Sequence, residues 1–465
     1  MKFVFDEVYS LDQRCYDEFG LNEDILMENA AQAISKEIHK KFKKGSLVFV
    51  ASGPGNNGAD GVTLARILHG DFKVFLYLPL GAKSKMCQIQ LKRAENIGIS
   101  IVDNIIQSDI IVDALFGSGL NKSLNDKVIS IIKELNEHKS YKIACDIPTG
   151  IDIKGNPNPI SFKADMTISM GAYKTPLFGD NAKDFVGIIK VADLGISRSV
   201  YEGQSGTFLL EKKDMRLPYR YRKSSNKGDF GHSLMILGEK KGACVIAAKA
   251  SFAFGSGLCS VYSKKAVKLP DEIMLSKQIP QKVTSIAFGM GLGERYKPEL
   301  LKEIIEKKET PVVLDADILK SEAVLLFLSQ RTNLILTPHP KEFSILLKIC
   351  GFGEFDTKDI QKDRFAFARE FTNKYKDIVL LLKGSNTLIA QNKKVFINSF
   401  GTNALSKGGS GDVLTGLIAS MTAQGFKPLD AAIISSLAHS FAAKRYKKAN
   451  YSLTPNDLIE GIKCL

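Results

Sequence analysis

The segment 401–416, "GTNALSKGGSGDVLTG", holds five glycines around a single aspartate, Asp412, and runs directly into an apolar stretch. A flexible linker would stay polar, whereas here Leu414, Leu417 and Ile418 follow at spacings that place them on one helical face. We therefore predict a glycine-rich loop that opens a helix. Such a loop offers backbone N–H groups and the positive end of the helix dipole to an anion, and phosphate is its natural ligand.

Asp412 stands at the head of this predicted helix, where bound phosphate would repel a carboxylate that had no chemical task. The task that suits it is to accept the proton of a hydroxyl group that attacks the transferring phosphoryl group. The alternative is an aspartate that caps the helix in a tight turn. Polar groups also follow two other predicted strands, at 383–387 and at His339 in "TPHP". A histidine in a turn is often structural, but three such strand ends favour a ligand site.

Composition limits the classes of protein to consider. The 465 residues, 44% of them hydrophobic and 25% charged, fit a soluble globular chain of two or three domains. No apolar run reaches the roughly 18 residues that span a bilayer, and the acidic amino terminus does not resemble a signal peptide, so we expect a cytoplasmic protein without a membrane role. The seven cysteines are scattered and never spaced C-x-x-C, which predicts reduced core residues and no metal site.

The net charge of +14 comes mainly from dispersed lysines. Because no basic face is interleaved with aromatic residues, a solvated surface that attracts anionic ligands is favoured over a nucleic-acid partner.

Strands alternate with helices in both halves of the chain. A helix is predicted over 22–42, and short apolar runs buried on both faces predict a parallel sheet covered by helices. The charged segment 205–228 lacks sustained periodicity and marks the boundary between two α/β domains, 1–210 and 211–465. In the second, a long helix is expected near 360–376, followed by a hairpin that turns at Asn392 and Lys393.

The first domain has a second candidate loop, "ASGPGNNGADG" at 51–61, between a predicted strand and a predicted helix. Its side chains Asn56, Asn57 and Asp60 suit the binding of ribose, an amide or a hard cation. Three further polar residues follow neighbouring predicted strands: Asp113, Asp146 and Thr149. One aspartate at a strand end is commonly a turn or cap residue, but several on neighbouring strands, each followed by glycine, favour a pocket.

An ordered set of motifs spans the second domain: "KGDFGHSLMILG", "GMGLG", "TPHPKE", "KGSNTL" and "GGSGDVLTG". The set resembles the NAD(P)H-hydrate dehydratase family, which has a ribokinase-like three-layer αβα fold. In that family an ADP- or ATP-dependent reaction phosphorylates the C6 hydroxyl of hydrated NADH or NADPH, and loss of phosphate restores the nicotinamide ring.

By position, the resemblance implies that Asp412 is the base and a substrate contact, with Mg²⁺ as cofactor. The implied nucleotide contacts are Lys383, Gly384, Ser385, Asn386, Thr387 and Gly411. The implied hydrate pocket is lined by Ala243, Gly291 and His339. Lys341 stands where the family usually has glycine.

The first domain resembles the companion NAD(P)H-hydrate epimerase domain, which is Rossmann-like, three-layer αβα, and interconverts the R and S hydrates. The resemblance implies a potassium ion held by Asn57, Asp113 and Thr149, and places Asp146 at the reacting ring as the acid/base candidate. The implied dinucleotide contacts are Asn56, Asn57, Gly58, Ala59, Asp60, Gly117, Ser118, Gly119, Leu120, Asn121, Lys122 and Ser123. Ala59 stands where the family usually has glycine.

The sequence thus predicts a two-domain repair enzyme for NADH and NADPH hydrates that uses ADP or ATP, and we expect a homo-oligomer. Two alternatives stay open. One is an ordinary kinase of a small alcohol, which would release a stable phosphorylated product. The other is a non-catalytic first domain that binds nucleic acid or protein.

Overall fold

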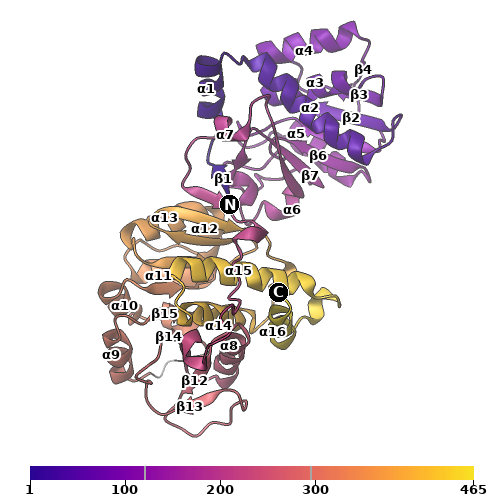
Figure 1. Cartoon of the computed structure of the whole chain (residues 1–465). Helices are drawn as coiled ribbons and strands as arrows, with labels where there is room; N and C mark the ends of the chain where they lie inside the picture. Colours follow the sequence, from indigo (N-terminus) through magenta and orange to yellow (C-terminus); the bar gives the residue numbers. More distant parts are fainter. Residues whose placement is uncertain (120–121, 294–295) are drawn as a thin grey trace. The chain divides into compact units, whose positions relative to one another are not determined.

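The computed structural model describes residues 1–119, 122–293 and 296–465. The chain divides into two compact units, Phe3–Ser205 and Gly206–Leu465, the second of which includes Met1–Lys2. Each unit is an α/β structure built on its own largely parallel sheet (Figure 1). The order of elements in the first unit is β1 (Lys2–Phe5), α1 (Tyr9–Phe19), α2 (Glu23–Lys41), β2 (Leu47–Ser52), α3 (Asn56–Leu68), β3 (Lys73–Tyr77), α4 (Lys85–Asn96), β4 (Ser100–Val102), β5 (Ile110–Ala114), α5 (Asp126–Glu137), β6 (Tyr141–Cys145), β7 (Met166–Met170), β8 (Tyr173–Lys174), α6 (Lys183–Val186), β9 (Ile188–Ala192) and α7 (Arg198–Tyr201).

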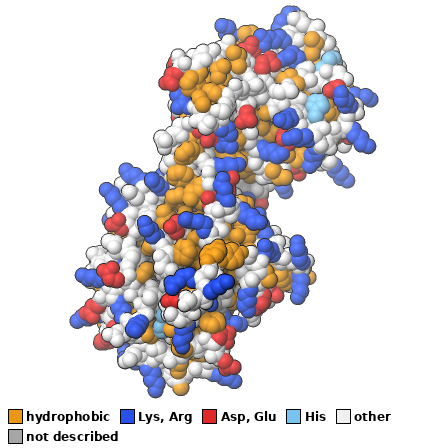
Figure 2. Space-filling view, in the orientation of Figure 1, with side chains coloured by type: hydrophobic (Ala, Val, Ile, Leu, Met, Phe, Trp, Pro, Cys, Tyr) orange, Lys and Arg blue, Asp and Glu red, His pale blue; other side chains and the backbone are white. Residues whose placement is uncertain are grey.

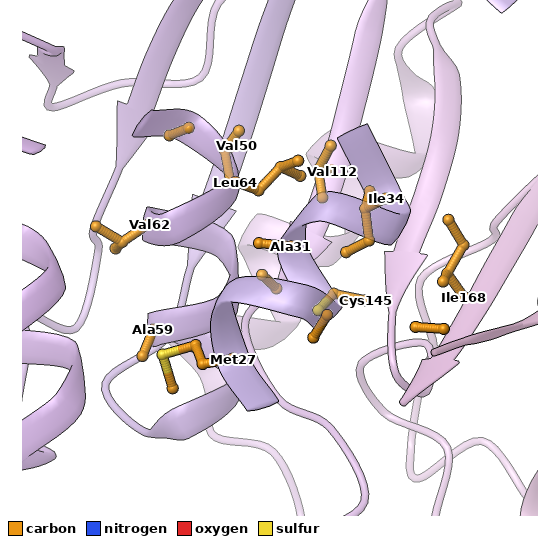
Figure 3. Close-up of a cluster of buried hydrophobic side chains, with 14 of the residues drawn as sticks. Met27, Ala31, Ile34, Val50, Ala59, Val62, Leu64, Val112, Cys145 and Ile168 are labelled. Atoms are coloured by element: carbon orange, nitrogen blue, oxygen red, sulfur yellow. The ribbon is translucent and has the colours of Figure 1, made fainter. Parts of the chain in front are cut away.

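Strand β2 shows why this unit has three layers. From Val48 onward its residues are buried, and its apolar side chains alternate between two hydrophobic clusters, as side chains on a strand point to opposite faces. Val48 and Val50 pack with α2, α3 and α4, whereas Phe49 and Ala51 pack with α5. Figure 3 shows the first cluster, in which Met27, Ala31 and Ile34 of α2 lie among side chains of the strands and of α3. The parallel sheet covered by helices, predicted from the apolar strands, is confirmed.

The order of strands locates a crevice in the first sheet. The order is β4-β3-β2-β5-β6-β7-β9, and all neighbours are parallel. The chain therefore runs outward from β2 to β4 and then returns to the other side of β2. In such sheets the loops that leave the two strands at the reversal diverge, and ligands bind between them at the carboxyl ends. Here those loops follow β2 and β5.

The second unit repeats the same architecture with other elements. Its order is β10 (Thr207–Leu209), β11 (His232–Ile236), α8 (Lys241–Ala253), β12 (Leu258–Tyr262), β13 (Met274–Ser276), β14 (Ser285–Phe288), α9 (Pro298–Glu306), β15 (Val312–Leu314), α10 (Val324–Gln330), β16 (Leu334–Leu336), α11 (Pro340–Ile349), α12 (Thr357–Lys362), α13 (Arg364–Lys374), β17 (Val379–Leu382), β18 (Thr387–Gln391), β19 (Lys394–Asn398), α14 (Ser410–Ala423), α15 (Pro428–Arg445) and α16 (Pro455–Lys463). The strands of this unit follow one another in the order β13-β12-β11-β14-β15-β16-β17-β18-β19-β10.

Helices cover both faces of this sheet as well. Val379 and Leu381 share a cluster with residues of α8, α14 and α15, so the alternate residues Leu380 and Leu382, also buried, face the other layer. Helices α9, α10 and α11 lie on the side opposite to α8 and α14 (Figure 1). The order again reverses, this time between β11 and β14, which places a second crevice at the carboxyl ends of those strands.

The second unit contains the predicted hairpin but not the predicted single long helix. The hairpin is confirmed, since Asn392 and Lys393 join β18 to β19 with φ values of 47° and 64°. The single long helix near 360–376 is wrong, because α12 ends at Lys362 and α13 begins at Arg364. Asp363 breaks the run: its side chain accepts the backbone N–H of Ala366 and caps α13.

Six of the seven cysteines are buried and unpaired, as predicted, but Cys464 is exposed, since it follows the last turn of α16. Figure 2 shows Lys and Arg side chains scattered over the visible face with acidic residues among them. Among the described residues, no helix combines the length and apolarity that crossing a membrane requires.

Candidate active sites

The crevice of the first unit brings together three predicted residues from three loops. Asn57 lies in the first turn of α3, Gly117 follows β5 and Asp146 follows β6. A Cβ atom placed on Gly117 would lie 2.9 Å from both Asn57 Oδ1 and Asp146 Oδ2, so the two side chains converge on this glycine. Both polar atoms of the Asn57 amide are buried and have no hydrogen-bond partner within the described ranges. An unpaired buried amide is costly, which indicates a ligand at this point.

Asp113 and Thr149 form a second polar group beside it. The Thr149 hydroxyl donates to Asp113 Oδ1 at 2.7 Å, and the Thr149 N–H donates to Oδ2 at 2.8 Å. The N–H of Phe116, next to Gly117, donates to the Thr149 hydroxyl at 3.0 Å. Complete burial raises the pKa of Asp113 to about 6, although these hydrogen bonds favour its ionised form. The pair ties the loops after β5 and β6 together.

Asp146 is the most constrained side chain of this crevice. Its backbone has a φ of 69°, in the left-handed region that only glycine adopts freely. Oδ2 accepts the N–H of Ser118 at 3.0 Å, while Oδ1 accepts the N–H of Met170 at 3.2 Å and the ammonium of Lys174. Burial raises the pKa of Asp146, but Lys174 and the N–H donors outweigh it and leave the pKa below its usual value.

Asp60, one turn along α3 from Asn57, behaves in the opposite way. Burial and the nearby charge of Asp146 raise its pKa well above the usual range. Burial thus favours the neutral form of Asp60, whereas the partners of Asp146 favour its charged form. Two acidic groups whose surroundings push their pKa values apart are the usual basis of acid/base pairs in enzymes.

The other residues predicted for this crevice divide into packing and surface positions. Gly58 packs against the Gly53 carbonyl, and Ala59 is buried inside α3 with no positive φ, so alanine brings no strain there. Asn56 is exposed and donates to Glu23. Lys122 and Ser123 are exposed, and open space surrounds Gly119. Leu120 and Asn121 lie outside the described residues.

In the second unit, Asp412 and Lys383 lie at the same sheet edge. Gly409 adopts a φ of 87° and turns the chain into α14, of which Asp412 is the third residue. A Cβ atom on Gly411 would lie 3.5 Å from Lys383 Nζ, so the lysine points at the start of this helix. Burial and the charge of Asp315 raise the pKa of Asp412 to about 6, although Lys383 lowers it. A carboxyl group with this pKa is well suited to accept a proton near neutral pH.

Asp315, which follows β15, organises this edge and has no predicted role. It is buried, pairs with Lys383 Nζ at 2.8 Å and accepts the Thr415 hydroxyl at 2.8 Å. Glu342 lies 3.9 Å from Lys383. Burial opposes the charged form of Lys383, but the two carboxylates prevail and raise its pKa. The lysine therefore keeps its positive charge beside the helix N-terminus, where phosphate would bind.

His339 has a structural task. The ring Nδ1 of His339 accepts the backbone N–H of Glu342 at 3.2 Å, and the backbone N–H of His339 donates to Glu342 Oε2 at 2.9 Å. His339 is therefore the N-cap of α11. Burial lowers the pKa of His339. The charges of Lys383 and Asp315 also affect this pKa, which indicates that both residues lie near the ring. It thus lies at the same edge, half exposed, with the capping interaction fixing its ring. Lys341 is exposed in the first turn of α11.

The second crevice holds the remaining hydrate-pocket residues. A Cβ atom on Gly291, whose φ is 57°, would lie 3.2 Å from that of Ala243, so the loop after β14 meets the first turn of α8 at this pair. The neighbouring Cys244 has a raised pKa because of burial and, in part, the charge of Asp412. The Ala243–Gly291 pair and Asp412 therefore belong to one region.

Arg364 stabilises the segment 383–387, which is predicted to bind the nucleotide. This buried side chain donates to the carbonyls of Asn386 at 2.8 Å, Leu382 at 2.9 Å and Lys383 at 3.0 Å. Asn386 is itself buried and Thr387 begins β18, whereas Gly384 and Ser385 are exposed. The segment is therefore a rigid turn at the carboxyl end of β17.

Sequence reasoning missed Lys174, Asp315 and Arg364. Asp315 carries the same signal as Asp113 and Asp146, an aspartate directly after an apolar strand, and could have been found. Lys174 and Arg364 are ordinary basic residues in the sequence, and only their burial marks them.

Both crevices lie where α/β enzymes bind nucleotides and dinucleotides. The chain therefore belongs to the class of nucleotide-binding α/β enzymes. A family model described as NAD(P)H-hydrate dehydratase matches residues 233–463, and one described as YjeF-related protein N-terminus matches residues 23–176. The bifunctional NAD(P)H-hydrate repair enzyme Nnr of Helicobacter pylori is 43% identical over 476 residues, 100% of both chains. That of Coxiella burnetii is 32% identical, over 93% of this chain and 92% of its own.

A solved ADP/ATP-dependent NAD(P)H-hydrate dehydratase from Bacillus subtilis, co-crystallised with ATP and Mg²⁺, matches 54% of this chain and 93% of its own, with 25% identity and a TM-score of 0.45. The full-length sequence matches establish that the chain belongs to the family of bifunctional NAD(P)H-hydrate repair enzymes.

Proposed function

We propose that the unit Gly206–Leu465 dehydrates the S hydrate of NADH or NADPH with ADP or ATP, and that the unit Phe3–Ser205 interconverts the R and S hydrates. The observation that carries the proposal is the full-length similarity to the bifunctional repair enzymes, together with a polar crevice at the strand reversal of each unit. The two reactions complement one another, because a stereospecific dehydratase alone would clear one epimer.

In the dehydration, Asp412 takes the proton of the C6 hydroxyl as the hydroxyl oxygen attacks the terminal phosphorus of the nucleotide. Lys383 and the N–H groups at the start of α14 hold the negative charge of the transferring group. Phosphate then leaves C6, assisted by the lone pair of the ring nitrogen, and loss of a proton from C5 restores the ring double bond. Hydroxide would be a poor leaving group, which is why the nucleotide is consumed.

In the dehydratase crevice, the small residues Ala243 and Gly291, which pack closely together, would contact the nicotinamide ring. His339 would border the ring from α11. The turn at 383–387, braced by Arg364, would receive the adenine nucleotide, as would Gly411.

In the epimerisation, C6 is inverted by breaking its bond to the hydroxyl oxygen or to the ring nitrogen and reforming that bond on the other face. Both routes move a proton on and off a heteroatom. Asp146, whose pKa is lowered, would accept this proton, and Asp60, whose pKa is raised, would donate one. Residues 56–60 and 117–123 would hold the dinucleotide.

The donor groups of Asn57, Asp113 and Thr149 fit a potassium ion, since amide, carboxylate and hydroxyl oxygens are ligands of hard cations. The unpaired amide of Asn57 is the structural observation that supports this site. When bound, the ion would fix the three loops and balance the charge of Asp113. In the second unit, Mg²⁺ bound to the nucleotide phosphates would neutralise the phosphate charge.

We further propose that the enzyme acts in the cytoplasm, where reduced dinucleotides and adenine nucleotides occur, which the unpaired cysteines support. The expected homo-oligomer and the absence of a nucleic-acid partner stay predictions.

The proposal is tested with each pure epimer. The S hydrate of NADPH with ATP should give NADPH and one phosphate per turnover; a stable phosphorylated product would instead indicate a small-alcohol kinase. The R hydrate without nucleotide should give the S hydrate, faster in KCl than in choline chloride of equal ionic strength. Thr149→Val should abolish that difference, and the matched Thr149→Ser should retain it. An equal rate in both salts would contradict the potassium site.

A further inference from the structure

Lys174 lies at the epimerase crevice but does not belong to the loops that follow β2, β5 and β6. It ends the two-residue strand β8, which pairs with β1 through Phe5 and Lys174. The lysine is 2% exposed. Its ammonium group donates to Asp146 Oδ1 and, at 3.1 Å, to the Met170 carbonyl. A lysine is rarely buried to this extent unless it is paired, so the Asp146 partnership accounts for its position.

The contacts of Asp146 assign different tasks to its two oxygens. Oδ1 accepts two hydrogen bonds, from Lys174 and from the Met170 N–H, which fill both of its lone pairs. Oδ2 accepts one, from the Ser118 N–H, and lies beside Gly117 and the unpaired amide of Asn57. Oδ2 is therefore the oxygen that retains an acceptor position on the crevice side.

The stability of the fold alone does not account for the buried ion pair of Lys174 and Asp146. A buried ion pair contributes little compared with well-packed apolar residues of similar size, because both charges lose their hydration. Asp146 also holds a left-handed backbone conformation that strains a non-glycine residue. Strained backbone and buried charge at one strand end are typical of functional positions, where a side chain must be aimed.

We propose that Lys174 is a positioning residue of the epimerase: with the Met170 N–H it saturates Asp146 Oδ1 and holds the carboxylate so that Oδ2 receives the proton of the hydrate. The inference rests on the proposed epimerase function. Lys174 acts through Asp146 and does not itself exchange a proton with the substrate.

Other charged groups face the pair from neighbouring elements. Asp60 of α3 and Asp12 of α1 interact with both charges, and Tyr201 of α7 donates to Asp12 at 2.7 Å. Cys145 precedes Asp146 and is buried. Lys174 is thus the cation among three carboxyl groups, so its removal withdraws the charge that holds Asp146 in place.

The test is a double-mutant cycle on the full-length chain, with R-to-S conversion of pure NADPH hydrate as the assay. Asp146→Asn should lower kcat by about 10² to 10⁴-fold, the range for a lost general base. Lys174→Met should lower kcat by about 10²-fold with KM little changed, as expected for a misplaced catalytic group. The double variant should be no slower than Asp146→Asn alone, because Lys174 then has nothing to position.

A matched control is Lys142→Met, since Lys142 is also a buried lysine, on β6, with its ammonium donating to the His138 carbonyl away from the crevice. It should leave kcat unchanged. If Lys174→Met does not fold, Lys174→Gln replaces it. Because glutamine keeps an N–H donor without the charge, its loss in kcat should be smaller than that of Asp146→Asn, and the variant that combines it with Asp146→Asn should again be no slower than Asp146→Asn alone. Losses that multiply in the double variant, or a change in KM alone, would overturn the inference. A wild-type chain that fails to epimerise would instead refute the proposed function.

Discussion

Lowering the pH from 7 to 5 is predicted to slow dehydration about tenfold, because Asp412 must be ionised to accept the hydroxyl proton. Its pKa is raised to about 6 by burial and by the charge of Asp315. With that pKa, about nine-tenths of the carboxyl groups are ionised at pH 7 and about one-tenth at pH 5. Since kcat/KM reports the free enzyme, this profile should fall with a slope of one below pH 6.

The assay follows the recovery of reduced-nicotinamide absorbance from the pure S hydrate with ATP, as initial rates between pH 5 and 8, with an enzyme-free sample at each pH. Asp315→Asn removes the negative charge that raises the pKa of Asp412, so the break in the profile should move to lower pH. Asp412→Asn should lower kcat by about 10² to 10⁴-fold throughout.

Asp430 supplies the matched control for these substitutions. It is the third residue of α15, as Asp412 is of α14, but its side chain is 40% exposed and pairs with Arg216. Asp430→Asn should leave both the rate and the profile unchanged. A profile that stays flat down to pH 5, or a break that moves to higher pH in Asp315→Asn, would refute this account of Asp412.

Three further substitutions test the packing of individual residues. Gly117→Ala brings a Cβ within 2.9 Å of Asn57 Oδ1 and Asp146 Oδ2, so epimerisation should slow by about tenfold or more while dehydration is unchanged. Ala59→Gly should cost about 1 kcal/mol in urea unfolding and speed neither reaction, because Ala59 is helical and buried; faster epimerisation would contradict this. Arg364→Met leaves three carbonyls without their donor and should lower stability by at least ~2 kcal/mol and raise the KM for ATP; an unchanged KM would show that the turn does not bind nucleotide.

In both sites, the residues that could be predicted from the sequence are those at the ends of apolar segments. Asp113, Asp146 and Asp412 each stand where an apolar segment meets glycine, and parallel topology brings the carboxyl ends of strands to one edge. The hairpin at Asn392 was also predictable, since asparagine tolerates positive φ.

The partners of these residues depend on tertiary packing and leave no local pattern. Lys174 comes from a strand outside the main parallel sheet, 28 residues after Asp146, and its burial is decided by the fold. The family resemblance implied that His339 lines the hydrate pocket. Its capping of α11 is evident only from the structure, in which His339 and Glu342 exchange two hydrogen bonds. The prediction of one long helix near 360–376 was wrong because the Asp363 side chain accepts the backbone N–H of Ala366 and starts a new helix there.

The most direct test of the two-reaction account supplies an equal mixture of R and S NADPH hydrate with ATP and measures the final recovery of NADPH absorbance, corrected for spontaneous epimerisation. The wild-type chain should recover nearly all of it within the time in which Asp146→Asn recovers about half, and Asp412→Asn should recover none. Full recovery by Asp412→Asn, or recovery that stops at half with the wild-type chain, would contradict the assignment of one reaction to each unit.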